Sequence, residues 1–173
     1  MQVDGAGDML GDLVAVCLRA MPTATSSSLA RSRDASPRAS LPLVTRTLLL
    51  LRNLALAPST GQVAAHREPI VDLILGGLNR HVGGPQHHTE LARAAASCLR
   101  AVLRGSSNDG GGKTAVGVGD RGAELAAVVE EGLVSLDSAR WSAPEEASRR
   151  RNGGSREADR QLWRELLAAK ALL

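Results

Sequence analysis

The sequence predicts an all-α protein, and three observations support this fold class. Leucine, valine and alanine supply most of the apolar residues, because the 173-residue chain has two tryptophans and no phenylalanine or tyrosine. Alanine and leucine are among the strongest helix formers. In several segments apolar residues recur three and four positions apart, which is the helical period. The stretch Leu43–Ala57 has four leucines in a row and stops before Pro58, which cannot continue a helix.

Composition and charge narrow the class of partner and the compartment. The formal net charge is +3, and the basic run Arg149–Arg151 has no interleaved aromatic residue. It therefore indicates a solvated loop rather than a nucleic-acid surface. Cys17 and Cys98 lie in apolar helical contexts and form no disulfide framework, which favours a reducing compartment. Because no apolar run approaches the roughly 18 residues of a membrane span, we expect a soluble intracellular protein.

The N-terminal part is expected to hold one short helix and one loop. Residues 1–22 contain a polar tail and an apolar stripe at helical spacing that ends at Pro22. Residues 23–42 are rich in Ser, Arg, Thr and Pro. They can bury too little apolar surface to offset the entropy of ordering them, so we expect a disordered loop.

The central part, residues 43–136, is expected to be a set of packed helices. Its first helix, Leu43–Ala57, is apolar on nearly all sides, which predicts burial. A short helix and a helix opened by Pro69 should follow. Glu90–Arg104 should form the next helix and end at Gly105. Arg121–Leu133 completes this part.

The C-terminal part is expected to combine a loop with an amphipathic helix. Residues 137–155 are polar and basic and predict a second disordered loop. Residues 156–173 carry a strong apolar face, and a terminal helix of this kind commonly caps a helical stack. Trp163 would then anchor the core, whereas an exposed Trp163 would mark a binding face.

An internal repeat connects two of these helices. A shift of 48 residues places Leu43 on Leu91 and Leu51 on Leu99. The interval holds a short helix and a second helix, which is the layout of a three-helix unit of about 40–47 residues. The pattern predicts about two stacked units of the armadillo or HEAT kind, because one unit cannot bury its own apolar face.

A resemblance supports this layout. The run Leu49–Ala55 resembles the third-helix signature of armadillo repeats, and Pro69–Leu78 resembles the second helix of the following unit. In peptide-binding members of that family, the third helix presents an Asn to a concave groove, with a Trp four residues earlier. Asn53 matches the Asn, whereas Leu49 stands at the Trp position. This departure argues against a groove of the nuclear-import type. The resemblance covers residues 43–133.

More narrowly, Leu48–Leu78 and the Ala-rich helix after it are similar to the C-terminal region of the rotatin family, which comprises large armadillo-like proteins of centrioles and ciliary basal bodies. This implies a scaffold in the cytoplasm or cytoskeleton that binds other proteins, and not an enzyme. Arg52 and Asn53 are the candidate concave residues, and the 48-residue register adds Arg100. Trp163 is a further candidate. No catalytic residue, cofactor, metal or small-molecule substrate is expected.

One motif keeps an enzyme alternative open. The run Gly117–Gly122 satisfies G-x-G-x-x-G, and Asp137 lies 20 residues after Gly117, where a ribose ligand is expected. The alternative is a fragment of a dinucleotide-binding oxidoreductase. It would require strands at residues 114–116 and 134–136, which are too short to build a doubly wound sheet.

Overall fold

Within the described residues the chain is entirely helical, as the sequence predicts. The computed structural model describes residues 5–20, 37–56, 63, 65–81, 88–107, 121–142 and 153–173, and no strand occurs among them. The helices of this part are α1 (Gly5–Ala20), α2 (Pro37–Leu56), α4 (Arg67–His81), α5 (Thr89–Ser107), α6 (Gly122–Ser142) and α8 (Gly153–Lys170).

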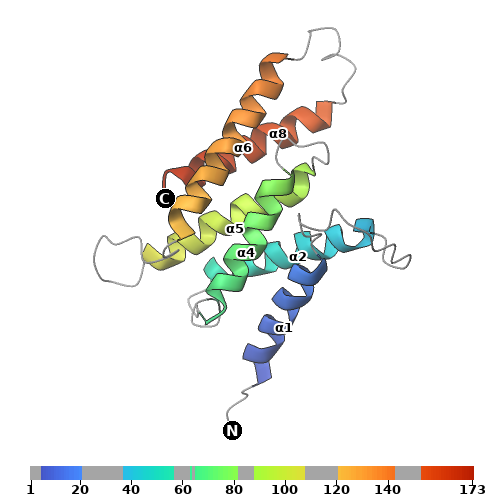
Figure 1. Cartoon of the computed structure of the whole chain (residues 1–173), viewed down its shortest axis with the longest axis vertical. Helices are drawn as coiled ribbons and strands as arrows, with labels where there is room; N and C mark the ends of the chain where they lie inside the picture. The colour runs from blue at the N-terminus through green and yellow to red at the C-terminus, as the bar shows by residue number, and fades with distance from the viewer. Residues whose placement is uncertain are drawn as a thin grey trace, which may run out of the picture.

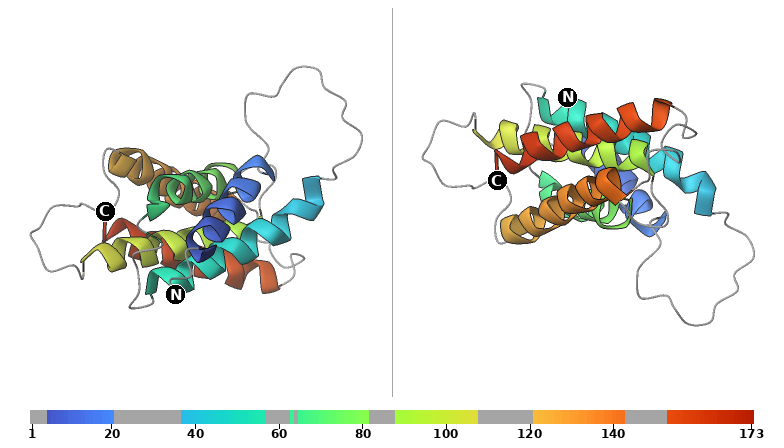
Figure 2. Two further views of the ribbon diagram at one scale, coloured as in Figure 1. Left: turned by 90° about the horizontal axis from the view of Figure 1, so that it is seen from below. Right: turned by 90° about the horizontal axis from the view of Figure 1, so that it is seen from above.

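The helices form two layers. Figure 1 shows α1, α4 and α6 running in one general direction, and α2, α5 and α8 running roughly against them. Figure 2 views the two layers edge-on. Helix α1 packs on α2, α4 on α5, and α6 on α8. The middle pair contacts both outer pairs, because α4 packs against α1 and α6, and α5 packs against α2 and α8. The described residues thus make three helix pairs, where the sequence predicted two three-helix units.

Helix α5 lies at the centre of this arrangement. It packs against α2, α4 and α8. Small side chains let these neighbours come close: a Cβ added at Gly77 of α4 would lie 2.9 Å from the Ala95 Cβ of α5. The buried residues of α5 are Leu91, Ala92, Ala94, Ala95, Ala96, Ser97, Cys98, Leu99, Ala101, Val102 and Leu103.

Helix α2 differs from its prediction in burial. The sequence predicted a helix covered on nearly all sides, but Leu43, Leu49 and Leu50 are 42%, 39% and 45% exposed. The prediction was wrong because α2 stands at one end of its layer, where α1 and α5 are its main neighbours. Its buried stripe is Val44, Leu48, Leu51 and Ala55, at the spacing of one helical face.

Helix α2 also begins earlier than predicted. It starts at Pro37 and continues through Pro42, so residues 37–42 are helical and not part of a disordered loop. A proline is well suited to a first helical position, and Leu41 packs against the core. The rest of the predicted loop, residues 23–36, lies outside the described residues.

Two other predicted boundaries were wrong. Helix α5 continues through Gly105 to Ser107, because Gly105 serves close packing: an added Cβ would lie 3.1 Å from the Ala55 carbonyl oxygen of α2. Helix α6 ends at Ser142 and α8 begins at Gly153, so parts of the predicted loop at 137–155 are helical. Residues 143–152 lie outside the described part of the chain.

The 48-residue register relates α2 to α5. Leu51 and Leu99 are both fully buried, as the register requires. Leu43 is exposed whereas Leu91 is 1% exposed. The pair differs because α5 has neighbours on both sides within its layer and α2 has a neighbour on one side.

Candidate functional site

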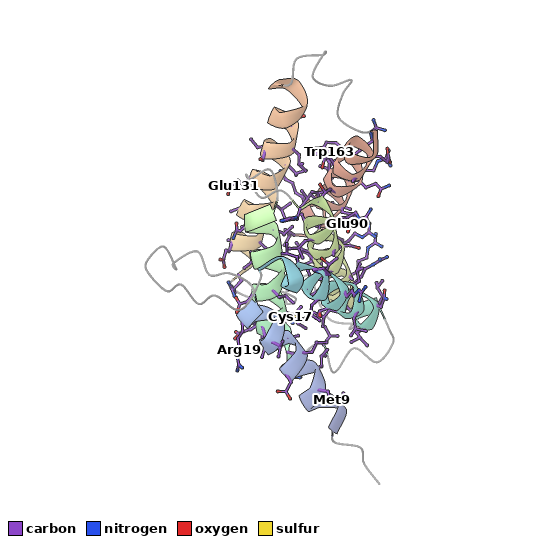
Figure 3. The ribbon with its side chains drawn as sticks, turned by 90° about the vertical axis from the view of Figure 1, so that its right-hand side faces the viewer. Met9, Cys17, Arg19, Glu90, Glu131 and Trp163 are labelled. Atoms are coloured by element: carbon purple, nitrogen blue, oxygen red, sulfur yellow. The ribbon has the colours of Figure 1, made fainter. Side chains whose placement is uncertain are left out.

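A groove of about 600 Å³ crosses the layer formed by α2, α5 and α8. Figure 3 shows α5 between α2 and α8, with Glu90 at the beginning of α5. Helix α5 forms the floor, and α2 and α8, which barely touch each other, form the two walls. The lining residues are Thr45, Leu49, Arg52, Glu90, Arg93, Ala94, Ser97, Gln161, Arg164 and Glu165.

The spacing of the lining residues follows from the amphipathic helices. On α2 the lining residues are Thr45, Leu49 and Arg52, which share one face because they lie four and seven positions apart. The core stripe of α2 faces inward, so this neighbouring face points to the groove. The floor runs from Glu90 to Ser97, seven residues of helix, which is about 10 Å at 1.5 Å per residue.

Polar contacts join the floor to the α8 wall. The Arg93 guanidinium donates a 2.6 Å hydrogen bond from Nη1 to the Gln161 side-chain oxygen. Arg100 Nη1 lies 3.1 Å from Glu165 Oε2 and forms an ion pair with it. The orientation of that pair gives no hydrogen bond, and Oε2 is buried without a donor among the described residues. The charge of Glu165 is therefore offset by Arg100, and the other charged lining residues are three arginines and one carboxylate, Glu90.

Two arginines, one on each wall of the groove, have no partner among the described residues. Arg52 lines the α2 wall and Arg164 lines the α8 wall. Within the described part of the chain, neither guanidinium has a hydrogen bond or an ion pair. An unpaired guanidinium offers planar donors that match a carboxylate. The groove can therefore bind an anionic group from either wall.

Cys98 lies on α5, near Arg52, and is inert as a nucleophile. Burial raises the pKa of the Cys98 thiol to about 12, and the positive charge of Arg52 opposes this rise. The thiol is fully buried and stays protonated at neutral pH, whereas the thiolate is the reactive form. Cys17 is also buried, and its thiol donates to the Thr47 hydroxyl at 3.2 Å.

The structure separates the four candidate residues predicted from the sequence. Arg52 lines the groove, but Asn53 is exposed and does not. Arg100 is held by Glu165. Trp163 is 37% exposed on α8, so of its two expected roles it does not anchor the core, and the preceding residue, Leu162, takes the buried face instead. Trp163 does not line the groove, and its place in a binding face stays a prediction.

Of the ten residues that line the groove, sequence reasoning identified Arg52 alone, and three of those it missed show why. Leu49 was noted only as a departure from the armadillo Trp position, yet it is exposed and lines the α2 wall. Arg93 lies 48 positions after Thr45, but Thr45 was not a predicted site residue, so the repeat register alone could not point to Arg93. Arg164 could not be found either, because the packing of α8 against α5 is a long-range contact with no local signature.

The enzyme alternative loses one of its required strands. Residues 134–136 lie inside α6 and are helical. Residues 114–120, which hold the other strand and most of the glycine motif, lie outside the described residues. Gly122 begins α6. A sheet with a strand at residues 134–136 is therefore excluded, and the oxidoreductase alternative lacks the second of its two required strands.

No protein-family model, curated protein or solved structure matches this chain. Among the described residues, no helix has the length and apolar character needed to cross a membrane. The same part of the chain has no group of three or more His, Cys, Asp or Glu side chains that could hold a metal ion. The groove is therefore the site on which a functional proposal rests.

Proposed function

We propose that this chain is a non-enzymatic protein-interaction scaffold of the armadillo/HEAT-like class, and that it binds a segment of another protein in the groove. The observation that carries the proposal is the groove itself. It crosses three helices of one layer, has a volume of about 600 Å³, and presents an exposed Leu49 beside the unpaired Arg52 and Arg164.

The physical character of the groove favours recognition of a protein segment. Binding sites combine an apolar contact with a few placed polar groups, and typical pockets have volumes of about 300–1,000 Å³. Leu49 is 39% exposed and supplies the apolar contact, and arginine is enriched at protein interfaces. Stacked helical repeats create such surfaces because neighbouring units place equivalent helices side by side.

Two features support the armadillo/HEAT-like class. The helix pairs stack in two layers, with equivalent helices adjacent within each layer (Figure 1). Leu49 on α2 and Ser97 on α5, which the 48-residue register relates to each other, both line the groove. The similarity of Leu48–Leu78 to the rotatin family is the reason to seek the partner among proteins of centrioles and ciliary basal bodies.

A matched pair of variants tests the proposal. Leu49 and Leu50 are adjacent on α2 and similarly exposed, at 39% and 45%, but Leu50 does not line the groove. The purified chain, Leu49→Glu and Leu50→Glu would be used to capture proteins from an extract of ciliated cells, with quantitative mass spectrometry. Thermal melts would first establish that all three chains fold.

We expect a protein that the wild type and Leu50→Glu capture equally and that Leu49→Glu captures about tenfold less, which corresponds to about 1.4 kcal/mol. The proposal fails if no captured protein depends on Leu49. Capture that depends on Leu50 instead would assign binding to the end of the stack and would also contradict it.

A further inference from the structure

We infer that the groove takes a short, extended, acidic segment of the partner, with carboxylates facing Arg52 and Arg164 and an apolar side chain against Leu49. This inference rests on the proposed scaffold function and adds the chemistry of the ligand. It is carried by the charges, the length and the composition of the groove.

The charge of the groove favours an anionic ligand. Arg52, Arg93 and Arg164 come from three different helices and converge on one groove. Glu165 is offset by its ion pair with Arg100, so the three arginines outnumber the one remaining lining carboxylate, Glu90. Arg52 and Arg164 have no partner within the described residues, so binding a carboxylate costs them no existing contact. A charge-assisted pair with a guanidinium is among the stronger hydrogen bonds available to a peptide.

The length of the groove suits a short segment. The floor along α5, from Glu90 to Ser97, measures about 10 Å. An extended chain advances about 3.3 Å per residue, so about three residues span the floor. A segment with an apolar residue between two acidic residues therefore offers, within this length, one carboxylate for each arginine and one apolar side chain for Leu49.

The composition of the groove favours a peptide over a nucleic acid. No aromatic side chain lines it, so it offers no platform on which bases could stack. Glu90 is also among the lining residues, and its carboxylate opposes a ligand that carries evenly spaced negative charges along the whole floor. Leu49 gives an apolar contact that a phosphate backbone cannot use. A peptide can vary its charge along the groove, and a polyphosphate cannot.

The test uses defined peptides and the full chain. The probe is a fluorescein-labelled peptide with a Glu-Leu-Glu core between Gly and Ser residues, followed by fluorescence anisotropy. Peptides with Gln-Leu-Gln and Lys-Leu-Lys cores and a single-stranded oligonucleotide are the comparison ligands. The groove variant is Arg52→Gln with Arg164→Gln. The control variant is Arg46→Gln with Arg104→Gln, which removes the same charge from exposed arginines on α2 and α5 that do not line the groove.

We expect the wild type and the control variant to bind the Glu-Leu-Glu peptide alike, and the groove variant to bind it about tenfold more weakly. The Gln-Leu-Gln peptide should bind the wild type as weakly as the Glu-Leu-Glu peptide binds the groove variant. Equal binding of the acidic and neutral peptides, equal loss in both double variants, or tighter binding of the oligonucleotide would each overturn the inference.

The two proposals fail separately. If the wild type does not bind the acidic peptide but captures a cellular protein through Leu49, the scaffold function stands and the acidic chemistry is wrong. If capture also ignores Leu49, both proposals are wrong.

Discussion

Helices α2 and α5 belong to the same layer and relate to each other by the 48-residue register, yet their burial is opposite to their hydrophobicity. Helix α2 has four consecutive leucines, and Leu49 and Leu50 are exposed. Helix α5 is rich in alanine and is buried around most of its circumference between Leu91 and Leu103. Large apolar residues therefore mark the end of this layer, and small ones mark its centre.

The number of neighbours explains the difference. Three helices pack against α5, and a helix approached from several sides needs small side chains at its contacts. Gly77 of α4 and Ala95 of α5 meet at such a contact. Helix α2 packs mainly on α1 and α5, so one stripe of leucines is enough for its core face. Of its exposed leucines, Leu49 lines the groove, whereas Leu43 and Leu50 do not.

The largest expected difference in stability is between Leu→Ala substitutions in the two helices. Leu99 of α5 is fully buried, whereas Leu50 of α2 is 45% exposed. Leu99→Ala should lower the free energy of unfolding by about 2–5 kcal/mol, because it leaves a cavity. Leu50→Ala should change it by less than about 0.5 kcal/mol. Urea denaturation measures both, and similar losses would mean that α2 is as buried as α5.

A smaller effect is expected where α4 crosses α5. Gly77→Ala places a Cβ 2.9 Å from the Ala95 Cβ, so the two helices must separate. Overpacking costs about 1–3 kcal/mol, which exceeds the roughly 1 kcal/mol that alanine gains over glycine in a helix. Gly122→Ala is the control, because its Cβ meets nothing within 4 Å. Thermal melts in which Gly77→Ala is the more stable variant would show that α4 and α5 are not in close contact.

The burial of α5 also predicts an alkaline loss of stability. The pKa of Cys98 rises from its ordinary value of 9.0 to about 12 in the folded chain. The contribution of the protonated Cys98 thiol to the free energy of unfolding is fully present below pH 9. It is lost as the pH rises toward 12, because the thiol of the unfolded chain releases its proton at a lower pH than the buried thiol does. The loss should be about 1.4 kcal/mol for each pH unit in this window.

Comparison with Cys98→Ala isolates this contribution. Urea denaturation at several pH values between about 8 and 10.5 would show how the free energy of unfolding of each chain changes with pH. The wild type should lose stability with pH more steeply than Cys98→Ala. Parallel slopes would mean that the Cys98 thiol titrates normally and that α5 is not covered at this position.

The smallest expected effect concerns the α6–α8 pair at the far end of the stack. Lys170 Nζ lies 2.8 Å from Glu130 Oε1, and this contact lowers the pKa of Glu130. The stabilisation is present above the ordinary carboxyl pKa of 4.5 and is lost as the pH falls through the lower folded value. Both side chains are about half exposed, so the effect is small.

Glu130→Gln and its neighbour Glu131→Gln sharpen this comparison. Glu130→Gln should be less stable than the wild type at pH 7 and equal to it at about pH 3. Glu131 is an exposed carboxylate without an ion pair among the described residues. Glu131→Gln should therefore be as stable as the wild type at both pH values. A pH-independent difference for Glu130→Gln would contradict the ion pair.

The sequence predicts where the helices lie in the chain better than it predicts which helices pack against each other. Apolar spacing indicates α1, α5 and α8, because each must cover one stripe. It missed the start of α2, since Pro37 and Pro42 read as loop residues until Leu41 is known to pack on the core. Arg52 could be predicted from the armadillo resemblance. Arg164 could not, because the contact between α5 and α8 depends on distant parts of the chain.

Hydrogen exchange followed by mass spectrometry tests the central position of α5 most directly. Amides exchange slowly where opening requires global unfolding and faster where a helix opens locally. The amides of α5 between Leu91 and Leu103 should exchange most slowly in the chain, and those of α2 between Leu43 and Leu56 should exchange sooner. Protection of α2 that equals or exceeds that of α5 would contradict the central claim that the alanine-rich helix, and not the leucine-rich one, is the centre of the fold.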